Sequence, residues 1–229
     1  MNYFTQDLRI FYFYGFASSP QSNKAQFFKK KFENEGIEFN ILDYIPTKSH
    51  FSHLKISSLL EDLNSIILNL EPSKIVLFGS SFGAYLSTWL AKKNPDRIFK
   101  LILMAPALIF SSKTILQLMG TSLREWEETG YLDIFHFRYN TSIPLHYSFY
   151  HDLVDFPPPD MTISTILTPT LIFHGRYDEI IPIEWSHKFT LINPSARLYV
   201  LEGDHQLLDQ KEEMWNSIVK FLHLKEKEP

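Results

Sequence analysis

The chain of 229 residues carries a formal net charge of −4 and contains no cysteine, with 45% apolar and 21% charged residues. This length and composition fit one ordinary globular domain with a sizeable core. The acidic balance argues against a nucleic-acid partner, which would need a basic face, and the missing cysteines exclude disulfides, zinc–thiolate sites and a cysteine nucleophile.

The first elements along the chain are predicted to be a strand and a helix. The amino-terminal stretch breaks its apolar run with Asp7 and Arg9 and has no small-residue cleavage site, so we expect no signal peptide and a cytoplasmic protein. No apolar run reaches the length of a membrane span. Residues 9–14, RIFYFY, are rich in β-formers and predict a buried strand. A helix should follow, capped by Ser19 and ended by Gly36.

The rest of the chain alternates between strand-like and helix-like segments. Apolar residues recur at helical spacing from 51 to 70, which predicts a helix with one packing face. About six strands with interleaved helices predict an α/β fold, in which helices cover both faces of an open, mostly parallel sheet. The other expected strands are residues 37–44, 74–80, 98–107, 168–175 and 196–203, and the other expected helices are 82–93, 183–192 and 211–223.

The alternation breaks once, between about residues 108 and 166. This segment is irregular, aromatic and proline-bearing, and it is too long for an ordinary connection. We therefore expect a small cap inserted into a single domain that spans residues 1–229. Aromatic residues of the cap either line an apolar pocket or only pack the cap onto the body. Under the first interpretation, Trp126 and Tyr147 are pocket residues.

The stretch FGSSFGAYL, residues 78–86, places two adjacent serines between a predicted strand and a predicted helix. A nucleophile on such a sharp turn needs glycines two residues to either side, the pattern G-x-S-x-G. Centred on Ser81 these positions are Gly79 and Gly83, whereas centred on Ser80 both are phenylalanine. The register therefore selects Ser81 as the candidate nucleophile, and the alternative is a glycine-bordered turn without chemistry.

A serine nucleophile needs a histidine base, and the base needs an orienting acid. The carboxyl ends of parallel strands meet at the same edge of a sheet, where Ser81 also lies. Asp178 and Glu179 follow one predicted strand, and His205 follows the next. This is the chain order Ser, acid, His that suits the architecture. We predict His205 as the base and Asp178 as its orienting acid, with Glu179 as the alternative.

Acyl transfer also needs hydrogen-bond donors for the developing oxyanion. The backbone N–H of Phe82, directly after the candidate nucleophile, is one expected donor. The N–H of Phe16, in the loop YGFASSP after the first strand, is the other. The remaining histidines show no regular ligand spacing, so we expect neither a metal nor a cofactor.

The motifs GSSFG, HGRYDEIIP and GDHQL, in that order and with a cap between the fourth and fifth strands, make the chain resemble the α/β-hydrolase superfamily. More narrowly, YGFASSP followed by GSSFGAYLS is similar to the small YqiA-type bacterial esterases. The resemblance covers nearly the whole chain. It implies a catalytic triad of Ser81, Asp178 and His205, with Phe16 and Phe82 as oxyanion donors.

One position departs from this resemblance. Such esterases usually have a histidine before the early glycine, where this chain has Tyr14. Because that histidine normally orders the oxyanion loop, we expect Tyr14 to order the loop differently and to border the substrate pocket.

Motif and topology together predict a serine hydrolase, of the carboxylesterase or thioesterase type. Its partner would be an apolar, acyl-bearing small molecule, cleaved through an acyl-enzyme intermediate. The alternative is a non-catalytic small-molecule binding protein that keeps the hydrolase fold. Such proteins usually lose a member of the triad, and none is missing here.

Overall fold

The computed structural model describes residues 8–71 and 73–224, and in them six strands form one parallel sheet in the order β2-β1-β3-β4-β7-β8. Every hydrogen-bonded neighbour pair in this sheet is parallel. The predicted α/β class is therefore confirmed. The six strands are β1 (Leu8–Phe13), β2 (Glu38–Ile41), β3 (Lys74–Ser80), β4 (Ile98–Met104), β7 (Thr170–Gly175) and β8 (Ala196–Leu201).

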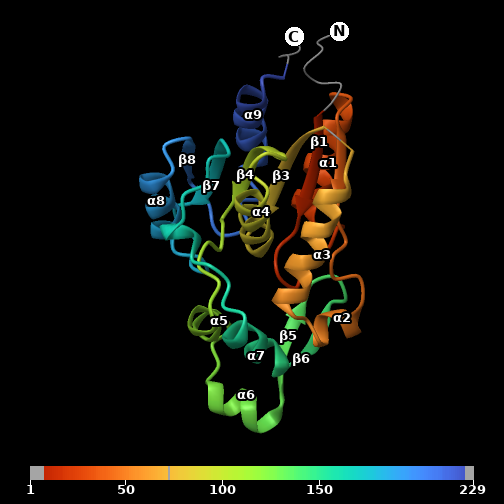
Figure 1. Ribbon diagram of the computed structural model, residues 1–229, viewed down its shortest axis with the longest axis vertical. Coiled ribbons are helices and arrows are strands. Elements are labelled where there is room, and N and C mark those ends of the chain that lie inside the picture. Colours follow the sequence, from red (N-terminus) through yellow and green to blue (C-terminus); the bar gives the residue numbers. More distant parts are fainter. Residues whose placement is uncertain (1–7, 72, 225–229) are drawn as a thin grey trace.

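Helices cover both faces of the sheet (Figure 1). Alternate residues of β1 enter two different cores, with Ile10 and Tyr12 in one and Phe11 and Phe13 in the other. The first core is closed by α1 (Asn23–Asn34) and α9 (Lys211–Leu222). The second is closed by α2 (Lys48–Ser52), α3 (Ile56–Asn69), α4 (Phe82–Lys93) and α8 (Ile183–Ile192).

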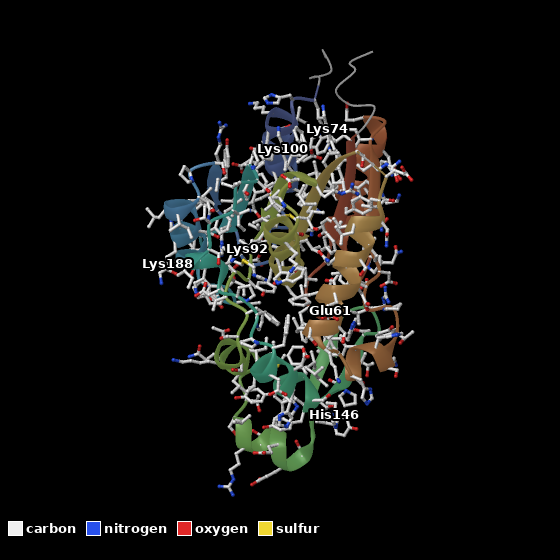
Figure 2. All side chains as sticks on the ribbon, in the orientation of Figure 1. Glu61, Lys74, Lys92, Lys100, His146 and Lys188 are labelled. Carbon is white, nitrogen blue, oxygen red and sulfur yellow. The ribbon has the colours of Figure 1, made fainter. Side chains whose placement is uncertain are left out.

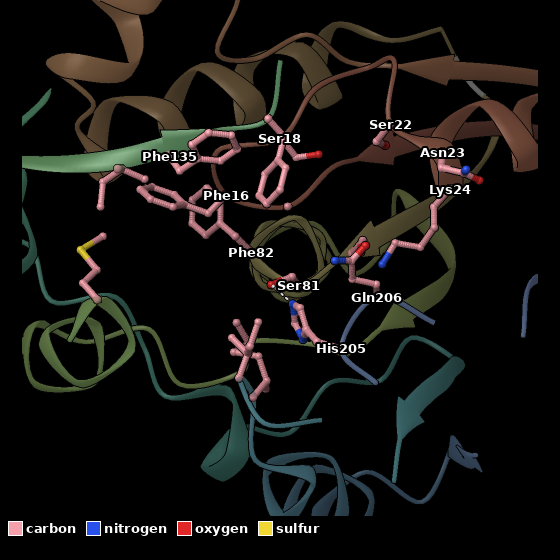
Figure 3. Close-up of a pocket in the computed structure, with 18 of the residues that line it drawn as sticks. Phe16, Ser18, Ser22, Asn23, Lys24, Ser81, Phe82, Phe135, His205 and Gln206 are labelled. Atoms are coloured by element: carbon pink, nitrogen blue, oxygen red, sulfur yellow. Dashed lines mark hydrogen bonds between the residues drawn. The ribbon is translucent and has the colours of Figure 1, made fainter. Parts of the chain in front are cut away.

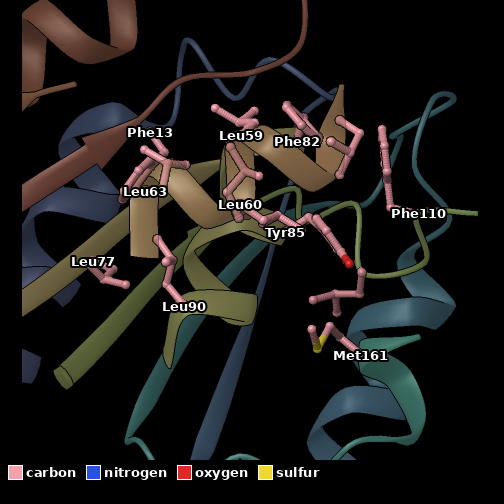
Figure 4. Close-up of a cluster of buried hydrophobic side chains, with 14 of the residues drawn as sticks. Phe13, Leu59, Leu60, Leu63, Leu77, Phe82, Tyr85, Leu90, Phe110 and Met161 are labelled. Atoms are coloured by element: carbon pink, nitrogen blue, oxygen red, sulfur yellow. The ribbon is translucent and has the colours of Figure 1, made fainter. Parts of the chain in front are cut away.

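The second core joins the sheet to the segment that follows β4 (Figure 4). Leu60 of α3, Leu77 of β3 and Tyr85 of α4 are buried in it. Phe110 and Met161, both beyond β4, are buried in the same cluster. Truncating such a fully buried side chain to alanine costs about 2–5 kcal/mol, so this core holds helix α4 firmly against the sheet.

Two helical regions differ from the sequence-based expectation. Helix α1 begins after Ser22 rather than Ser19, because Ser19 instead forms a turn: its Oγ accepts the N–H of Gln21 at 3.2 Å and its carbonyl accepts the N–H of Ser22 at 3.1 Å. The helix expected over residues 51–70 is two helices, α2 and α3, because Lys55 before α3 is extended, with φ −123° and ψ 125°.

Between β4 and β7 the chain forms regular elements where an irregular segment was expected. The strands β5 (Tyr131–His136) and β6 (Thr141–His146) pair as an antiparallel hairpin, which the sequence pattern did not reveal because Tyr131 and Phe135 on β5 are exposed aromatics. The single domain with a cap at 108–166 stays a prediction, and residues 108–166 are called the cap segment. The elements here are α5 (Ser112–Met119), α6 (Leu123–Thr129), β5 (Tyr131–His136), β6 (Thr141–His146), α7 (Ser148–Asp155) and a 3-10 turn (Met161–Ile163).

The strands of the main sheet run toward this cap segment. Lys74, the first residue of β3, lies near one end of the molecule, and His146, the last residue of β6, lies near the other (Figure 2). The loops after the strands therefore face the cap segment, which is where an open α/β sheet binds its ligands. None of the helices in the described ranges combines the length and the apolarity that crossing a bilayer requires.

Candidate active site

Ser81 lies on the turn between β3 and α4 in an unfavourable backbone conformation. Its φ of 54° and ψ of −117° are values that a residue with a side chain seldom adopts. Neighbouring backbone holds it there, because its N–H donates to the carbonyl of Met104 at 2.8 Å and its carbonyl accepts the N–H of Ala84 at 3.0 Å. Such strain is typical of functional positions.

The glycines that flank Ser81 are required by close backbone approach. A Cβ on Gly83 would lie under 3.0 Å from the carbonyl group of Phe13, and a Cβ on Gly79 equally close to the backbone of Ala84. Real Cβ atoms essentially never come this close, and no side-chain rotation relieves a collision with backbone. The glycines of the motif therefore allow the turn to pack against β1 and α4.

We expect Gly83→Ala to lower the free energy of unfolding by roughly 4 kcal/mol or more, the range of a severe backbone collision. The matched control is Gly120→Ala, since Gly120 caps α5 with φ 62° and a Cβ there meets no atom within 4 Å. The control should cost only about 1–2 kcal/mol for its left-handed backbone. Urea denaturation of both variants measures the difference, and equal costs would contradict the role given to Gly83.

The structure brings Ser81, His205 and Asp178 together from three different loops. The Oγ of Ser81 lies 3.1 Å from Nε2 of His205, and Nδ1 of His205 lies 2.8 Å from Oδ2 of Asp178. The side chain of Asp178 is 0% exposed and that of His205 is 17% exposed, so of these two side chains solvent reaches only the histidine. Since an ionised carboxylate only accepts hydrogen bonds, the proton of a neutral His205 lies on Nδ1, and Nε2 is free to accept from Ser81.

Asp178 has a second histidine partner, which the sequence reasoning treated as structural. Nε2 of the fully buried His174 lies 3.2 Å from Oδ2 of Asp178 and 3.0 Å from the carbonyl of Ile181. Both are acceptors, so this nitrogen carries a proton, while Nδ1 of His174 faces the hydroxyl of Ser186 at 2.7 Å. His174 therefore fixes the same carboxylate oxygen, Oδ2, that accepts the hydrogen bond from His205.

The carboxylate of Asp178 is held in its ionised form. Burial alone would raise its pKa, but hydrogen bonds from His174 and His205, the charge of His205 and the backbone N–H of Ile181 together hold the pKa of Asp178 well below its usual range. Its Oδ1 accepts the N–H groups of Ile180 at 2.9 Å and Ile181 at 2.8 Å. The Asp178 carboxylate is therefore a fixed acceptor for the Nδ1–H of His205.

The alternative acid, Glu179, lies elsewhere. Its side chain is exposed and borders a separate hollow together with Trp185 and Pro182. The loop after β7 turns Asp178 inward through the two backbone hydrogen bonds to its Oδ1, and the next residue consequently faces solvent. The geometry therefore favours Asp178 as the partner of His205.

The loop after β1 lies directly against Ser81. A Cβ on Gly15 would stand 3.5 Å from Cβ of Ser81, which brings the next residue, Phe16, beside the candidate nucleophile. Within the described residues, the backbone N–H groups of Phe16 and Phe82 donate no hydrogen bond. Two unpaired N–H groups next to a serine hydroxyl are what an oxyanion hole requires.

Tyr14 does not border the pocket, contrary to the expectation. It is buried, its ring stacks on Tyr44 at 4.4 Å between centroids, and its hydroxyl donates to Oδ1 of Asp43 at 2.9 Å. Nη2 of Arg138, in the cap segment, lies 2.7 Å from both oxygens of that carboxylate. A tyrosine is long enough to reach the carboxylate of Asp43, so it links the loop after β1 to the cap segment.

The cap segment also bonds to the oxyanion loop itself. The N–H of Phe137 donates to the carbonyl of Ala17 at 2.9 Å, and Ala17 has a positive φ of 54°. The conformation of the loop that carries Phe16 thus depends on the hairpin β5–β6. No local sequence pattern predicts this contact, because Phe137 and Ala17 are far apart in the chain.

A pocket of about 630 Å³ opens over Ser81 and His205 (Figure 3). Trp126 and Tyr147 do not line it, contrary to the expectation: Trp126 is fully buried with its Nε1 donating to the carbonyl of Leu145 at 3.1 Å, and Tyr147 stacks on Tyr150. Both therefore pack the cap segment internally. The apolar lining comes instead from Phe16, Phe82, Ala107, Phe110, Ile115, Met119, Ile134, Phe135, Phe137, Ile180, Ile181 and Leu208.

The comparisons with known proteins agree with this architecture. A family model described as an uncharacterised protein family, UPF0227, matches residues 9–223. No curated protein matches the sequence. Among solved structures, α/β-hydrolase domain-containing protein 10 from mouse is 23% identical, with 93% of this chain and 89% of that chain covered and a TM-score of 0.71.

Two further solved structures are similar in fold. Est1E from Butyrivibrio proteoclasticus, bound to ferulic acid, is 18% identical, with 97% of this chain and 90% of that chain covered and a TM-score of 0.81. A monoacylglycerol lipase from Paleococcus ferrophilus is 17% identical, with 93% of each chain covered and a TM-score of 0.70. At these identities the similarity shows the shared fold.

Proposed function

The chain belongs to the UPF0227 family and shares its fold with solved α/β-hydrolases. From this premise we propose that it is a serine hydrolase that cleaves a carboxylic ester or thioester. The observation that carries the proposal is the aligned set of contacts from Ser81 Oγ to His205 at 3.1 Å and from His205 to Asp178 at 2.8 Å. A serine–histidine–carboxylate series of this geometry activates a hydroxyl for acyl transfer.

In the first half of the reaction, Oγ of Ser81 attacks the carbonyl carbon of the substrate while Nε2 of His205 takes the hydroxyl proton. The carbonyl oxygen becomes an oxyanion, which the N–H groups of Phe16 and Phe82 stabilise. Each such donor is worth about 10²–10³ in rate. Asp178 keeps Nδ1–H of His205 in place and stabilises the imidazolium that forms.

This first oxyanion then collapses, the bond from the acyl carbon to the leaving oxygen or sulfur breaks as His205 gives that atom its proton, and an acyl-enzyme on Ser81 remains. A water molecule then gives a proton to Nε2 of His205 and attacks the acyl carbon. Collapse of this second oxyanion releases the acid and returns the proton to Ser81. No step needs a cofactor.

The composition of the pocket supports an apolar acyl group as the part of the substrate that lies against the cap segment. Met119 of α5 and Phe135 of β5 line the pocket together with Phe16 and Phe82. Two of the similar structures bear on this choice: one is a monoacylglycerol lipase, and the other, Est1E, has ferulic acid bound. Ester or thioester cleavage of an apolar acyl group is the activity that this site best supports.

We expect kcat/KM for p-nitrophenyl esters and acyl-CoA thioesters to rise by up to about fourfold for each added methylene, the equivalent of about 0.8 kcal/mol, until the acyl chain fills the pocket. Steady-state hydrolysis across graded chain lengths measures this. If no ester or thioester of any length is hydrolysed while the acids still bind, the chain is a binding protein and the proposed activity is wrong.

A further inference from the structure

The pocket over Ser81 has two sides of different chemistry. In Figure 3 the rings of Phe16, Phe82 and Phe135 lie on one side of Ser81. Lys24 and Gln206 lie on the other side, where the lining is polar. A substrate that is bonded to Ser81 through its carbonyl carbon extends in both directions, so its two halves meet different surroundings.

Lys24 faces inward because of its place on helix α1. It stands four residues before Phe28 and eight before Phe32, both fully buried against the sheet, and residues four apart share one helix face. Lys24 itself is partly buried, and it lies one turn closer to the pocket end of that face. It is therefore the lysine of α1 that lines the pocket.

The ammonium of Lys24 has no hydrogen-bond or ion-pair partner within residues 8–71 and 73–224. Two other lysines of the same helix have partners: Lys29 pairs with Glu33, and Nζ of Lys31 lies 2.6 Å from Glu212, whereas Lys30 is exposed. An ammonium carries three hydrogen-bond donors, and those of Lys24 are available to a group bound in the pocket that it lines. The arrangement favours a ligand that supplies the missing acceptors.

The acidic groups whose charge reaches Lys24 are Asp204 and Asp178, and both are bonded to other groups. Asp178 accepts from two histidines and two backbone N–H groups. Oδ1 of Asp204 accepts the N–H groups of Gln206 at 2.8 Å and Leu207 at 3.1 Å. These carboxylates offset part of the cost of burying the positive charge of Lys24 without forming an ion pair with it.

We propose that Lys24 binds an anionic group, a carboxylate or a phosphate, on the alcohol or thiol half of the substrate. The inference rests on the proposed function and deepens it: the natural substrate is an ester or thioester that joins an apolar acyl group to an anionic alcohol or thiol. The acyl group occupies the aromatic side of Ser81, and the leaving half extends toward Lys24. Hydrolysis releases the fatty or aromatic acid and the anionic alcohol or thiol.

Matched pairs of substrates test the proposal. The phosphate arm compares 1-octanoylglycerol 3-phosphate with 1-octanoylglycerol. The carboxylate arm compares the octanoyl ester of 3-hydroxypropanoate with that of 3-hydroxypropanamide. We expect Lys24→Met to lower the anionic-to-neutral ratio of kcat/KM about 10–100-fold in the arm that matches the natural group, the size of a charge-assisted hydrogen bond in a sheltered site.

The control variant is Lys30→Met, which removes the same charge from the exposed side of the same helix and should leave the ratio unchanged. Lys24→Arg should recover most of the ratio, because it restores the positive charge. If the ratio is the same in the unmodified protein and in Lys24→Met in both arms, the inference is wrong even though ester hydrolysis stands.

Equilibrium binding separates this inference from the proposed activity. Octyl phosphate should bind to Ser81→Ala about 10–100-fold more tightly than to Ser81→Ala/Lys24→Met, whether or not the protein hydrolyses esters. Ser81→Ala/Lys30→Met should bind it like Ser81→Ala. Equal affinity in the presence and absence of Lys24 would overturn the inference.

The pH dependence of this binding gives a second signature. Burial lowers the pKa of Lys24 to about 8, opposed by the charges of Asp204 and Asp178. The ammonium is therefore present at neutral pH and is lost as the pH rises through about 8, while octyl phosphate keeps its two charges there. Affinity should fall over this range in Ser81→Ala and stay level in Ser81→Ala/Lys24→Arg. The other ionisable groups that line the pocket are Asp133, His205 and Tyr12.

Discussion

Ser81→Ala is expected to lower the turnover of the best ester by about 10³–10⁶-fold and to abolish labelling by a fluorophosphonate probe. The reason is that, in the part of the chain that the structure describes, Oγ of Ser81 is the one hydroxyl within hydrogen-bond distance of His205. A serine hydroxyl without a base is a poor nucleophile, and a base without the hydroxyl has nothing to activate. Intact-mass and peptide mass spectrometry after labelling measure the site and the extent of reaction.

The neighbouring serine provides the control. Ser80 is the last residue of β3, is buried, and its hydroxyl faces that of Tyr12, where it offsets part of the rise that burial causes in the pKa of Tyr12. Its hydroxyl thus bonds to Tyr12, whereas His205 bonds to Ser81, and Ser80→Ala should still carry the label on Ser81. Labelling that survives in Ser81→Ala, or that moves to Ser80, would refute the assignment of the nucleophile.

Much of this site was predictable from the sequence because its requirements are local. A residue in the strained turn of Ser81 needs small neighbours at fixed distances along the chain, and the collisions expected at Gly79 and Gly83 show why. The acid and the base follow successive strands of a parallel sheet, so order along the chain sets their edge of the sheet. Asp178 and His205 accordingly meet although 27 residues separate them.

The parts that the sequence did not reveal depend on contacts between distant segments. The hydroxyl of Tyr14 donates a hydrogen bond to the carboxylate of Asp43. That carboxylate also pairs with Arg138, which is 95 residues further along the chain. Trp126 packs inside the cap segment because its indole N–H reaches the carbonyl of Leu145. The spacing of residues in the sequence predicts none of these contacts. The aromatic content of the cap segment therefore did not show which of its rings line the pocket.

The inward position of Lys24 could have been predicted from the sequence. It precedes Phe28 and Phe32 at intervals of four, so it lies on the inward face of its helix while the neighbouring lysines pair with acids on other faces. A cation in line with buried rings is unusual because burying a charge is unfavourable. A binding role for Lys24 can be inferred only when the pocket that it lines is known.

Asp178→Asn is expected to lower kcat by about 10⁴-fold, since it reverses the tautomer of the base. Two backbone N–H groups, those of Ile180 and Ile181, face one oxygen of Asp178, and they will retain the amide oxygen of the asparagine. The amide NH₂ then faces Nδ1 of His205, which must become an acceptor. The ring proton moves to Nε2, and His205 can no longer accept a proton from Ser81.

His174 makes the same substitution unfavourable for the fold as well. Its Nε2–H now donates to Asp178, and in the variant it would face the NH₂ of the asparagine. Because the folded-state pKa of Asp178 is depressed, its carboxylate stabilises the fold above the unfolded pKa of the aspartate, and this stability is lost as the pH falls through that value and below. Thermal unfolding of Asp178→Asn should accordingly show a lower melting temperature and a weaker decline toward acidic pH.

The measurement that decides the assignment combines kinetics with nitrogen NMR of the histidine ring. Asp178→Asn should show the proton of neutral His205 on Nε2, together with the loss of turnover, whereas the unmodified protein shows it on Nδ1. Glu179→Gln is the matched control, because Glu179 is exposed and lies away from His205. Its turnover should change by less than about tenfold, in keeping with a surface substitution. A mild effect of Asp178→Asn beside a severe effect of Glu179→Gln would transfer the role of the acid to Glu179.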